Sequence, residues 1–260
     1  MIKSGKQISA LEALHEYLTP RRSQIDPELL RNTTSLKIAF KGISLDGCRW
    51  GASEKMIIFM HGWEGNLTSA FPLAAQLNAA GFSLLSFNSL ASGWPQPQET
   101  NLLEAGDTLF AAIRAIGDIH AVIGHSFGAA ATLLLEGRTV DSGIRRVVTF
   151  SSPSDVREHV LGVAQQKGWG NEIGAEICDI LDTRLGHPLD DLALDRVTGA
   201  FSLPGLIIHD RKDRIVPFKN ALRIVRNWQN SCLLETSGLG HHRAIKNPEV
   251  ISQVVAFLQL

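Results

Sequence analysis

Short, continuous apolar runs recur along this chain, and segments with helical spacing separate them. Strands that are buried on both faces of a parallel sheet have such uninterrupted runs, whereas half-exposed strands alternate apolar and polar residues. Strands that alternate with helices favour right-handed crossover connections. The sequence therefore predicts an α/β fold with a mostly parallel central sheet flanked by helices. The runs are KMIIFMH (55–61), FSLLSFN (82–88), HAVIGHS (120–126), RRVVTFSS (145–152), LPGLIIH (203–209) and SCLLET (231–236).

The alternation stops between Pro153 and Phe201, where helix-like patterns follow one another without a strand. An insertion of this size, placed late in the order of strands, is typical of a small helical cap that lies over one end of the sheet. We therefore assign residues 154–201 to a cap insertion. No clean linker surrounds it, so the cap is treated as part of one domain at residues 36–260.

The N-terminal residues 1–35 are expected to form a helical extension of this domain. Apolar residues have helical spacing from Ile8 to Leu18, which is the pattern of an amphipathic helix. The next residues, 36–50, are interpreted as two short strands around Gly42, with a turn at Asp46-Gly47. The role of the extension stays open at this stage.

Composition restricts the classes of function. The 260 residues carry a formal net charge of −1, which gives no basic excess for binding nucleic acid. Cys48, Cys178 and Cys232 are far apart and form no C-x-x-C pair, which argues against a disulfide framework and a thiolate zinc site. No apolar run approaches the ~20 residues that span a bilayer, and no secretory signal is evident. We expect a soluble cytoplasmic protein without a metal or other cofactor, which binds neither nucleic acid nor membrane.

The motif Gly124-His125-Ser126-Phe127-Gly128 stands where a buried strand becomes a helix. Sites in such sheets form at the carboxyl ends of the strands. A strand–Ser–helix turn exposes the hydroxyl, and the glycines on either side remove side chains that would collide there. The beginning of the helix also favours developing negative charge. Ser126 is therefore the candidate nucleophile, and the alternative is an ordinary buried serine in a turn.

A serine nucleophile needs a base, and the base needs an orienting carboxylate. His241 and His242 follow a glycine-rich loop after the strand SCLLET, at the same edge of the sheet as Ser126. The other histidines have the default interpretation of surface or core residues. Asp210 and Asp213 both follow the end of the strand LPGLIIH. Either one can orient the base on this evidence, and the other is a solvated loop charge.

Acyl transfer also needs hydrogen-bond donors for an oxyanion. The backbone N–H of Phe127, directly after the nucleophile, is one candidate. The backbone N–H of Trp63, in the earlier loop MHGWEGN (60–66), is the other. Gly62 and Gly65 let this backbone approach a ligand closely. The alternative for this loop is a plain glycine-rich turn.

Four motifs now occur in a distinctive order: HGW (61–63), GHSFG (124–128), DRKDRIVP (210–217) and GLGH (238–241). From about residue 36 to its end, the chain resembles the α/β-hydrolase superfamily, in which the order is Ser, Asp, His. The resemblance implies that Asp213 is the acid and His241 the base. Within the superfamily, the chain is similar to carboxylesterase-like and serine-aminopeptidase-like members. Asp155 occupies a second acid position that some members use.

One loop departs from the family pattern. Many members carry an Asp and a P-G-H-G-x-S stretch where this chain reads Asn88-Ser-Leu-Ala-Ser-Gly-Trp94. That loop usually shapes the pocket, so the substrate class does not transfer from the resemblance. We expect Trp94 and Trp169 to line a substrate pocket, together with apolar residues of the cap. The other interpretation of these cap residues is simple packing onto the body.

The predicted function is that of a serine hydrolase, which cleaves a small or medium acyl ester through an acyl-enzyme. A thioesterase or a perhydrolase can use the same triad, and a hydrolase-like scaffold can bind a small-molecule ligand with little turnover. A metal enzyme built on His209, Asp210, His241 and His242 lacks H-E-x-x-H or similar ligand spacing. The sequence leaves the oligomeric state open.

Overall fold

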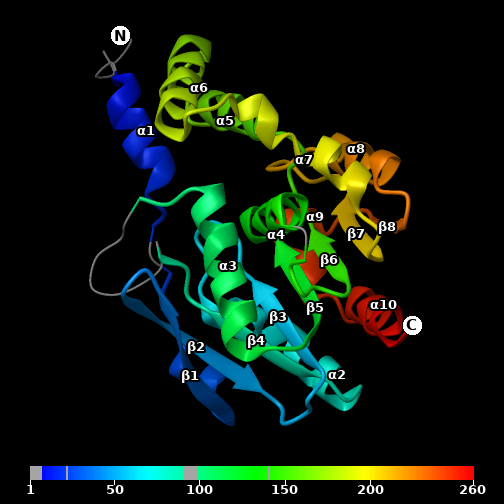
Figure 1. Ribbon diagram of the computed structural model, residues 1–260. Coiled ribbons are helices and arrows are strands. Elements are labelled where there is room, and N and C mark those ends of the chain that lie inside the picture. The colour runs from blue at the N-terminus through cyan, green and yellow to red at the C-terminus, as the bar shows by residue number, and fades with distance from the viewer. Residues whose placement is uncertain (1–7, 22, 91–98, 140) are drawn as a thin grey trace.

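The computed structural model describes residues 8–21, 23–90, 99–139 and 141–260. It contains an eight-stranded sheet in the order β1-β2-β4-β3-β5-β6-β7-β8 (Figure 1). β2 runs antiparallel to both β1 and β4, and all the other neighbours are parallel. The predicted fold class is thus confirmed. The strands are β1 (Thr33–Phe40), β2 (Ile43–Trp50), β3 (Met56–Met60), β4 (Ser83–Phe87), β5 (Ile119–His125), β6 (Val147–Phe150), β7 (Gly205–Asp210) and β8 (Ser231–Thr236).

Both faces of the sheet are covered, which explains the uninterrupted apolar runs. All five residues of β3 are buried. Ile58 packs in the cluster that includes α3, α4 and α8, whereas its neighbour Ile57 packs with α2 and α10. Successive side chains of a strand point to opposite faces, so each position of a doubly covered strand must be apolar. These helices are α2 (Phe71–Ala79), α3 (Leu102–Ile116), α4 (Phe127–Arg138), α8 (Lys219–Asn227) and α10 (Pro248–Gln259).

The predicted cap lies between β6 and β7 and consists of α5 (Val156–Gln166), α6 (Asn171–Leu185) and α7 (Leu194–Val197), with short 3₁₀ turns after α6 and α7. The N-terminal helix α1 (Ala10–Leu18) packs beside α6 (Figure 1). Lys167 Nζ lies 2.8 Å from Glu16 Oε1 and adds an ion pair between the cap and α1. The cap and the N-terminal helix therefore form one cover on the same side of the sheet.

The expected turn at Asp46-Gly47 is wrong. The β1–β2 turn is formed by Lys41 and Gly42, which both have positive φ (47° and 77°), while Gly47 pairs with Leu36 inside the hairpin. A Cβ on Gly47 would lie 2.8 Å from Leu36 Cδ1. The same Cβ would lie 3.1 Å from the Ser86 carbonyl oxygen, so packing across the sheet, and not a turn, favours glycine here.

Among the described residues, no helix is both long enough and apolar enough to cross a membrane.

Candidate active site

Ser126 lies between the end of β5 and the beginning of α4 and has a strained backbone, with φ 51° and ψ −114°. A positive φ is costly for a residue with a side chain, and it persists only where the surroundings enforce it. Here the Ser126 amide donates to the Phe150 carbonyl (2.8 Å), and the Ser126 carbonyl accepts from the Ala130 amide (3.0 Å). These two backbone bonds fix the turn on both sides of the serine.

The two glycines of the motif allow α4 to pack tightly against the strands. A Cβ on Gly124 would lie 2.4 Å from the Ala129 Cα, and one on Gly128 would lie 2.3 Å from the Met60 carbonyl oxygen. Side chains do not tolerate such distances to backbone atoms. The sequence pattern around Ser126 is therefore the pattern that this sharp strand-to-helix turn needs.

His241 and Asp213 are joined by a buried hydrogen bond. His241 Nδ1 donates to Asp213 Oδ2 at 2.8 Å, and Asp213 Oδ1 accepts from the amides of Ile215 and Val216 at 2.9 Å each. Burial acts to raise the pKa of Asp213, but the hydrogen bond and charge of His241 and the two amides outweigh it and hold this pKa below its usual value. The carboxylate thus stays ionised, and it keeps the proton of His241 on Nδ1, so that Nε2 is an acceptor.

Asp210, the other candidate acid, is buried at the end of β7, so the expectation of a solvated loop charge is wrong. Its carboxylate accepts from Thr236 Oγ1 (2.8 Å) and from the amides of Lys212 (2.8 Å), Gly238 (3.2 Å) and Leu239 (2.8 Å). Burial acts to raise its pKa, but these hydrogen bonds prevail and lower the pKa to about 2. Asp210 therefore ties the loop before His241 to the end of β7.

Asp155, the third acid considered, caps α5 by accepting from the Glu158 amide at 2.8 Å. That bond accounts for its position at the beginning of the helix.

The loop that carries Trp63 is held by a buried histidine that sequence reasoning did not single out. His61 Nε2 accepts from the Ser89 amide (3.3 Å), and His61 Nδ1 donates to the Gly62 carbonyl (2.8 Å). The Gly65 amide donates to the same carbonyl (2.9 Å). Because the peptide group is planar and trans, fixing the Gly62 carbonyl directs the Trp63 N–H to the opposite side.

In the part of the chain that the structure describes, the backbone N–H groups of Trp63 and Phe127 donate to no other residue. Phe127 is the first residue of α4, where N–H groups have no partner within the helix. The two side chains pack edge to face, with ring centroids 4.8 Å apart. Two free donors therefore lie on neighbouring residues beside Ser126.

No family model matches the chain, and no curated protein matches it in sequence. Several solved structures match the chain in three-dimensional structure, at low sequence identity. An esterase from Pyrococcus furiosus superposes with a TM-score of 0.71 at 21% identity, over 93% of this chain and 97% of that one. A bromoperoxidase from Bacillus anthracis gives 0.66 at 16% identity, over 87% and 100%. A thioesterase domain from the curacin biosynthetic pathway gives 0.63 at 13% identity, over 88% and 99%. The chain has the α/β-hydrolase fold.

In this α/β-hydrolase fold, His125 links the loops that carry the candidate site residues. His125 Nε2 donates to the His241 carbonyl at 2.9 Å, and a Cβ on Gly62 would lie 2.9 Å from His125 Nδ1. Burial lowers the pKa of His125 to about 3, with a smaller effect of charge on His241, so the ring is neutral. From the sequence, His125 had the default interpretation of a surface or core histidine, although its position inside the GHSFG motif was a signal.

His125, His241 and His242 also form the histidine cluster most suited to a metal among the described residues, with ring nitrogens within 4.8 Å of one another. His125 Nε2 and His241 Nδ1 carry protons that are donated to a carbonyl and a carboxylate, and their other ring nitrogens keep a lone pair. These two bonds fix both rings in the loops, and metal-ligating histidines make the same kind of bond through their second nitrogen. His209 and Asp210, the other residues of the set considered from the sequence, do not belong to this cluster.

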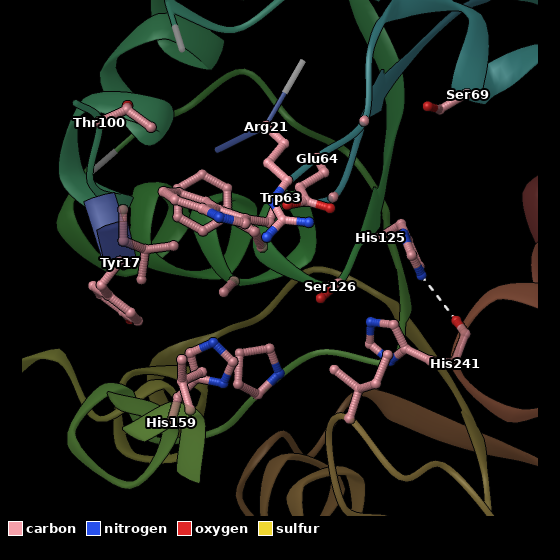
Figure 2. Close-up of a pocket in the computed structure, with 18 of the residues that line it drawn as sticks. Tyr17, Arg21, Trp63, Glu64, Ser69, Thr100, His125, Ser126, His159 and His241 are labelled. Carbon is pink, nitrogen blue, oxygen red and sulfur yellow. Dashed lines mark hydrogen bonds between the residues drawn. The ribbon is translucent and has the colours of Figure 1, made fainter. Parts of the chain in front are cut away.

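A cavity of about 1250 Å³ opens above Ser126 and His241. Its wall includes the α1 residue Tyr17, the α5 residue His159, and Trp169 from the α5–α6 connection. Figure 2 shows Tyr17, Trp63 and His159 on one side of Ser126, and His125 and His241 on the other. Trp94 lies outside the described residues. The cap and the N-terminal helix thus enclose a binding space over the candidate nucleophile.

Proposed function

We propose that this chain is a serine hydrolase that cleaves an acyl ester through an acyl-enzyme. The observation that carries the proposal is the arrangement at the floor of the cavity. A serine on a strained strand-to-helix turn shares the cavity with a histidine whose Nδ1 is bonded to an ionised, buried aspartate. A structural serine in a turn has no need of a buried histidine–aspartate pair beside an open cavity.

In the proposed reaction, His241 Nε2 takes the proton of the Ser126 hydroxyl while Ser126 Oγ attacks the acyl carbonyl carbon. The C–O bond of the ester breaks as His241 returns that proton to the leaving alcohol. A water molecule then attacks the acyl-enzyme with His241 again as base, which releases the acid and restores Ser126. Asp213 remains ionised and stabilises the imidazolium that forms in each half of the cycle.

The backbone N–H groups of Trp63 and Phe127 are the proposed oxyanion donors. They have no other partner among the described residues, and His61 fixes the orientation of the Trp63 peptide. Donors that are oriented before the reaction stabilise charge without reorganisation, and removing one typically costs a factor of about 10²–10³ in kcat.

The substrate is proposed to be a small-molecule acyl ester of small or medium length, held by Trp169 and the apolar side chains of the cap. A thioester fits the same cycle, because a thiolate replaces the alcoholate as leaving group, and a perhydrolase uses peroxide in place of water. A thioesterase domain among the structural neighbours is consistent with the first of these alternatives.

Hydrolysis of p-nitrophenyl esters over a range of acyl lengths tests the proposal, with Ser126→Ala beside the native chain. We expect turnover that peaks at one length and falls by roughly 10⁴–10⁶ in Ser126→Ala. Ser44→Ala, at an exposed position of β2, is the matched control and should retain full activity. A fluorophosphonate should label Ser126 in the native chain. Equal turnover by Ser126→Ala would exclude the proposed nucleophile.

A further inference from the structure

The cavity wall beneath the cap is mostly apolar but contains two polar rings. α1, α5 and α6 contribute the apolar residues Leu18, Val156, Val163, Leu181 and Leu185, and the polar residues Glu16, Tyr17, His159 and Gln166. The ring centroids of Tyr17 and His159 are 6.5 Å apart. The Tyr17 ring also stacks on Trp63 at 6.3 Å. The N-terminal helix thus brings a phenol group next to a residue that we assign to oxyanion binding.

Neither ring has a polar partner in the part of the chain that the structure describes. Among the described residues, the Tyr17 hydroxyl and the ring nitrogens of His159 take part in no hydrogen bond or ion pair. Both side chains are partly buried and line the cavity. The polar atoms of both rings are not among the fully buried ones, so in the cavity they can form hydrogen bonds with a polar ligand atom or with water.

The charge state of the pair restricts the ligand chemistry. Burial raises the pKa of Tyr17, and burial together with charge on His241 lowers the pKa of His159 to about 4. At neutral pH, both groups are therefore uncharged. A phenol donates and accepts, and a neutral imidazole offers one N–H and one lone pair. Such a pair suits a hydroxyl or a keto oxygen and gives no charge with which to hold a carboxylate or a phosphate.

We infer that the acyl chain of the substrate carries a hydroxyl or keto group, which hydrogen-bonds to Tyr17 Oη and the His159 ring. This rests on the proposed hydrolase function and names its substrate class. The apolar side chains around the pair are suited to the methylene groups of the chain. Tyr17 stacks on Trp63, whose N–H is a proposed oxyanion donor, so the polar group lies near the ester rather than at the far end of the chain.

The test compares p-nitrophenyl octanoate with its 2-hydroxy, 3-hydroxy and 3-keto derivatives. We expect at least one derivative to exceed octanoate in kcat/KM by about tenfold, because octanoate leaves the two polar groups unpaired. Tyr17→Phe removes only the hydroxyl and keeps the ring that stacks on Trp63. In Tyr17→Phe and His159→Phe, the ratio of kcat/KM for the preferred derivative to kcat/KM for octanoate should fall to about one. His187→Gln, in the cap but not in the cavity wall, should keep the preference.

Binding to Ser126→Ala separates this inference from the proposed function. Calorimetry with the methyl esters of octanoate and of the preferred derivative should show about tenfold tighter binding of the derivative, and Tyr17→Phe should abolish the difference. If Ser126→Ala remains active, the proposed nucleophile is wrong. The difference in affinity between the two esters does not depend on the nucleophile, so it still tests whether Tyr17 and His159 bind a polar group of the acyl chain. Equal affinities for the two esters, or a loss in Tyr17→Phe that affects both equally, overturns it and indicates that water satisfies the two rings.

Discussion

Replacing Asp210 with Asn tests whether this carboxylate stabilises the loop that leads to His241. The pKa of Asp210 is lowered from 3.8 to about 2 by the hydrogen bonds from Thr236 and the loop amides, against the effect of burial. A lowered pKa in the folded state means that the ionised carboxylate stabilises the fold at pH values above its unfolded pKa. With ~1.4 kcal/mol for each pKa unit, the contribution at pH 7 is about 2 kcal/mol.

The pH dependence follows from the same shift. The contribution is complete above about pH 5, falls to about half by pH 3, and is lost as the pH falls through about 2. Urea unfolding of the native chain and of Asp210→Asn at pH 7, 5 and 3 measures it. We expect a difference of about 2 kcal/mol at pH 7, or roughly 4–8 °C in Tm, that narrows at pH 3. Asp213→Asn is the matched comparison, since it alters the same β7–α8 loop but removes the partner of His241. Equal stability of Asp210→Asn and the native chain at pH 7, or a difference that does not vary with pH, would refute this account.

The remaining predictions concern the nucleophile turn and the base. Asp213→Asn should lower kcat by about 10⁴ with little change in KM, because the proton of His241 is no longer held on Nδ1, and steady-state kinetics check this. Gly128→Ala should unfold at a lower temperature and lose activity, since its Cβ would lie 2.3 Å from the Met60 carbonyl oxygen; thermal unfolding and p-nitrophenyl ester turnover measure both. His125→Phe should reduce kcat about tenfold and also lower Tm, because the buried His241 carbonyl loses its hydrogen bond. An unchanged kcat would contradict this role for His125.

The sheet was predictable because its strands are buried on both faces. Each position of β3 is apolar and buried, so the run of residues 55–61 could be recognised without knowledge of its neighbours. Parallel strands also bring their carboxyl ends to one edge. The loops after β5, β7 and β8 therefore had to approach one another, and the hydrogen bond between His241 and Asp213 spans two of them.

The contacts of the N-terminal helix were not predictable in the same way. The spacing of apolar residues shows that α1 buries one face, but it does not say which surface covers that face. Tyr17 stacks on Trp63, which follows it by 46 residues, and approaches His159 in the cap. Such pairs depend on how separate elements pack, and no local pattern of residues encodes them. The Asp46-Gly47 turn failed for a related reason, since the need for Gly47 arises from Leu36 on the paired strand.

The polar residues around the proposed triad show how a strained site is held in place. Asp210 fixes the loop before His241, His61 fixes the peptide between Gly62 and Trp63, and His125 joins the nucleophile turn to the His241 backbone. None of these three needs to contact the reacting atoms. Each of the three lies at the carboxyl end of a strand or directly after it, and each bonds to backbone groups of the segments that follow the strands. The same bonds that satisfy this backbone also fix the relative positions of the nucleophile, the base and the oxyanion donors. A substitution at any of the three should therefore lower kcat, because it displaces the proposed nucleophile, base or oxyanion donors from the positions that the transition state requires.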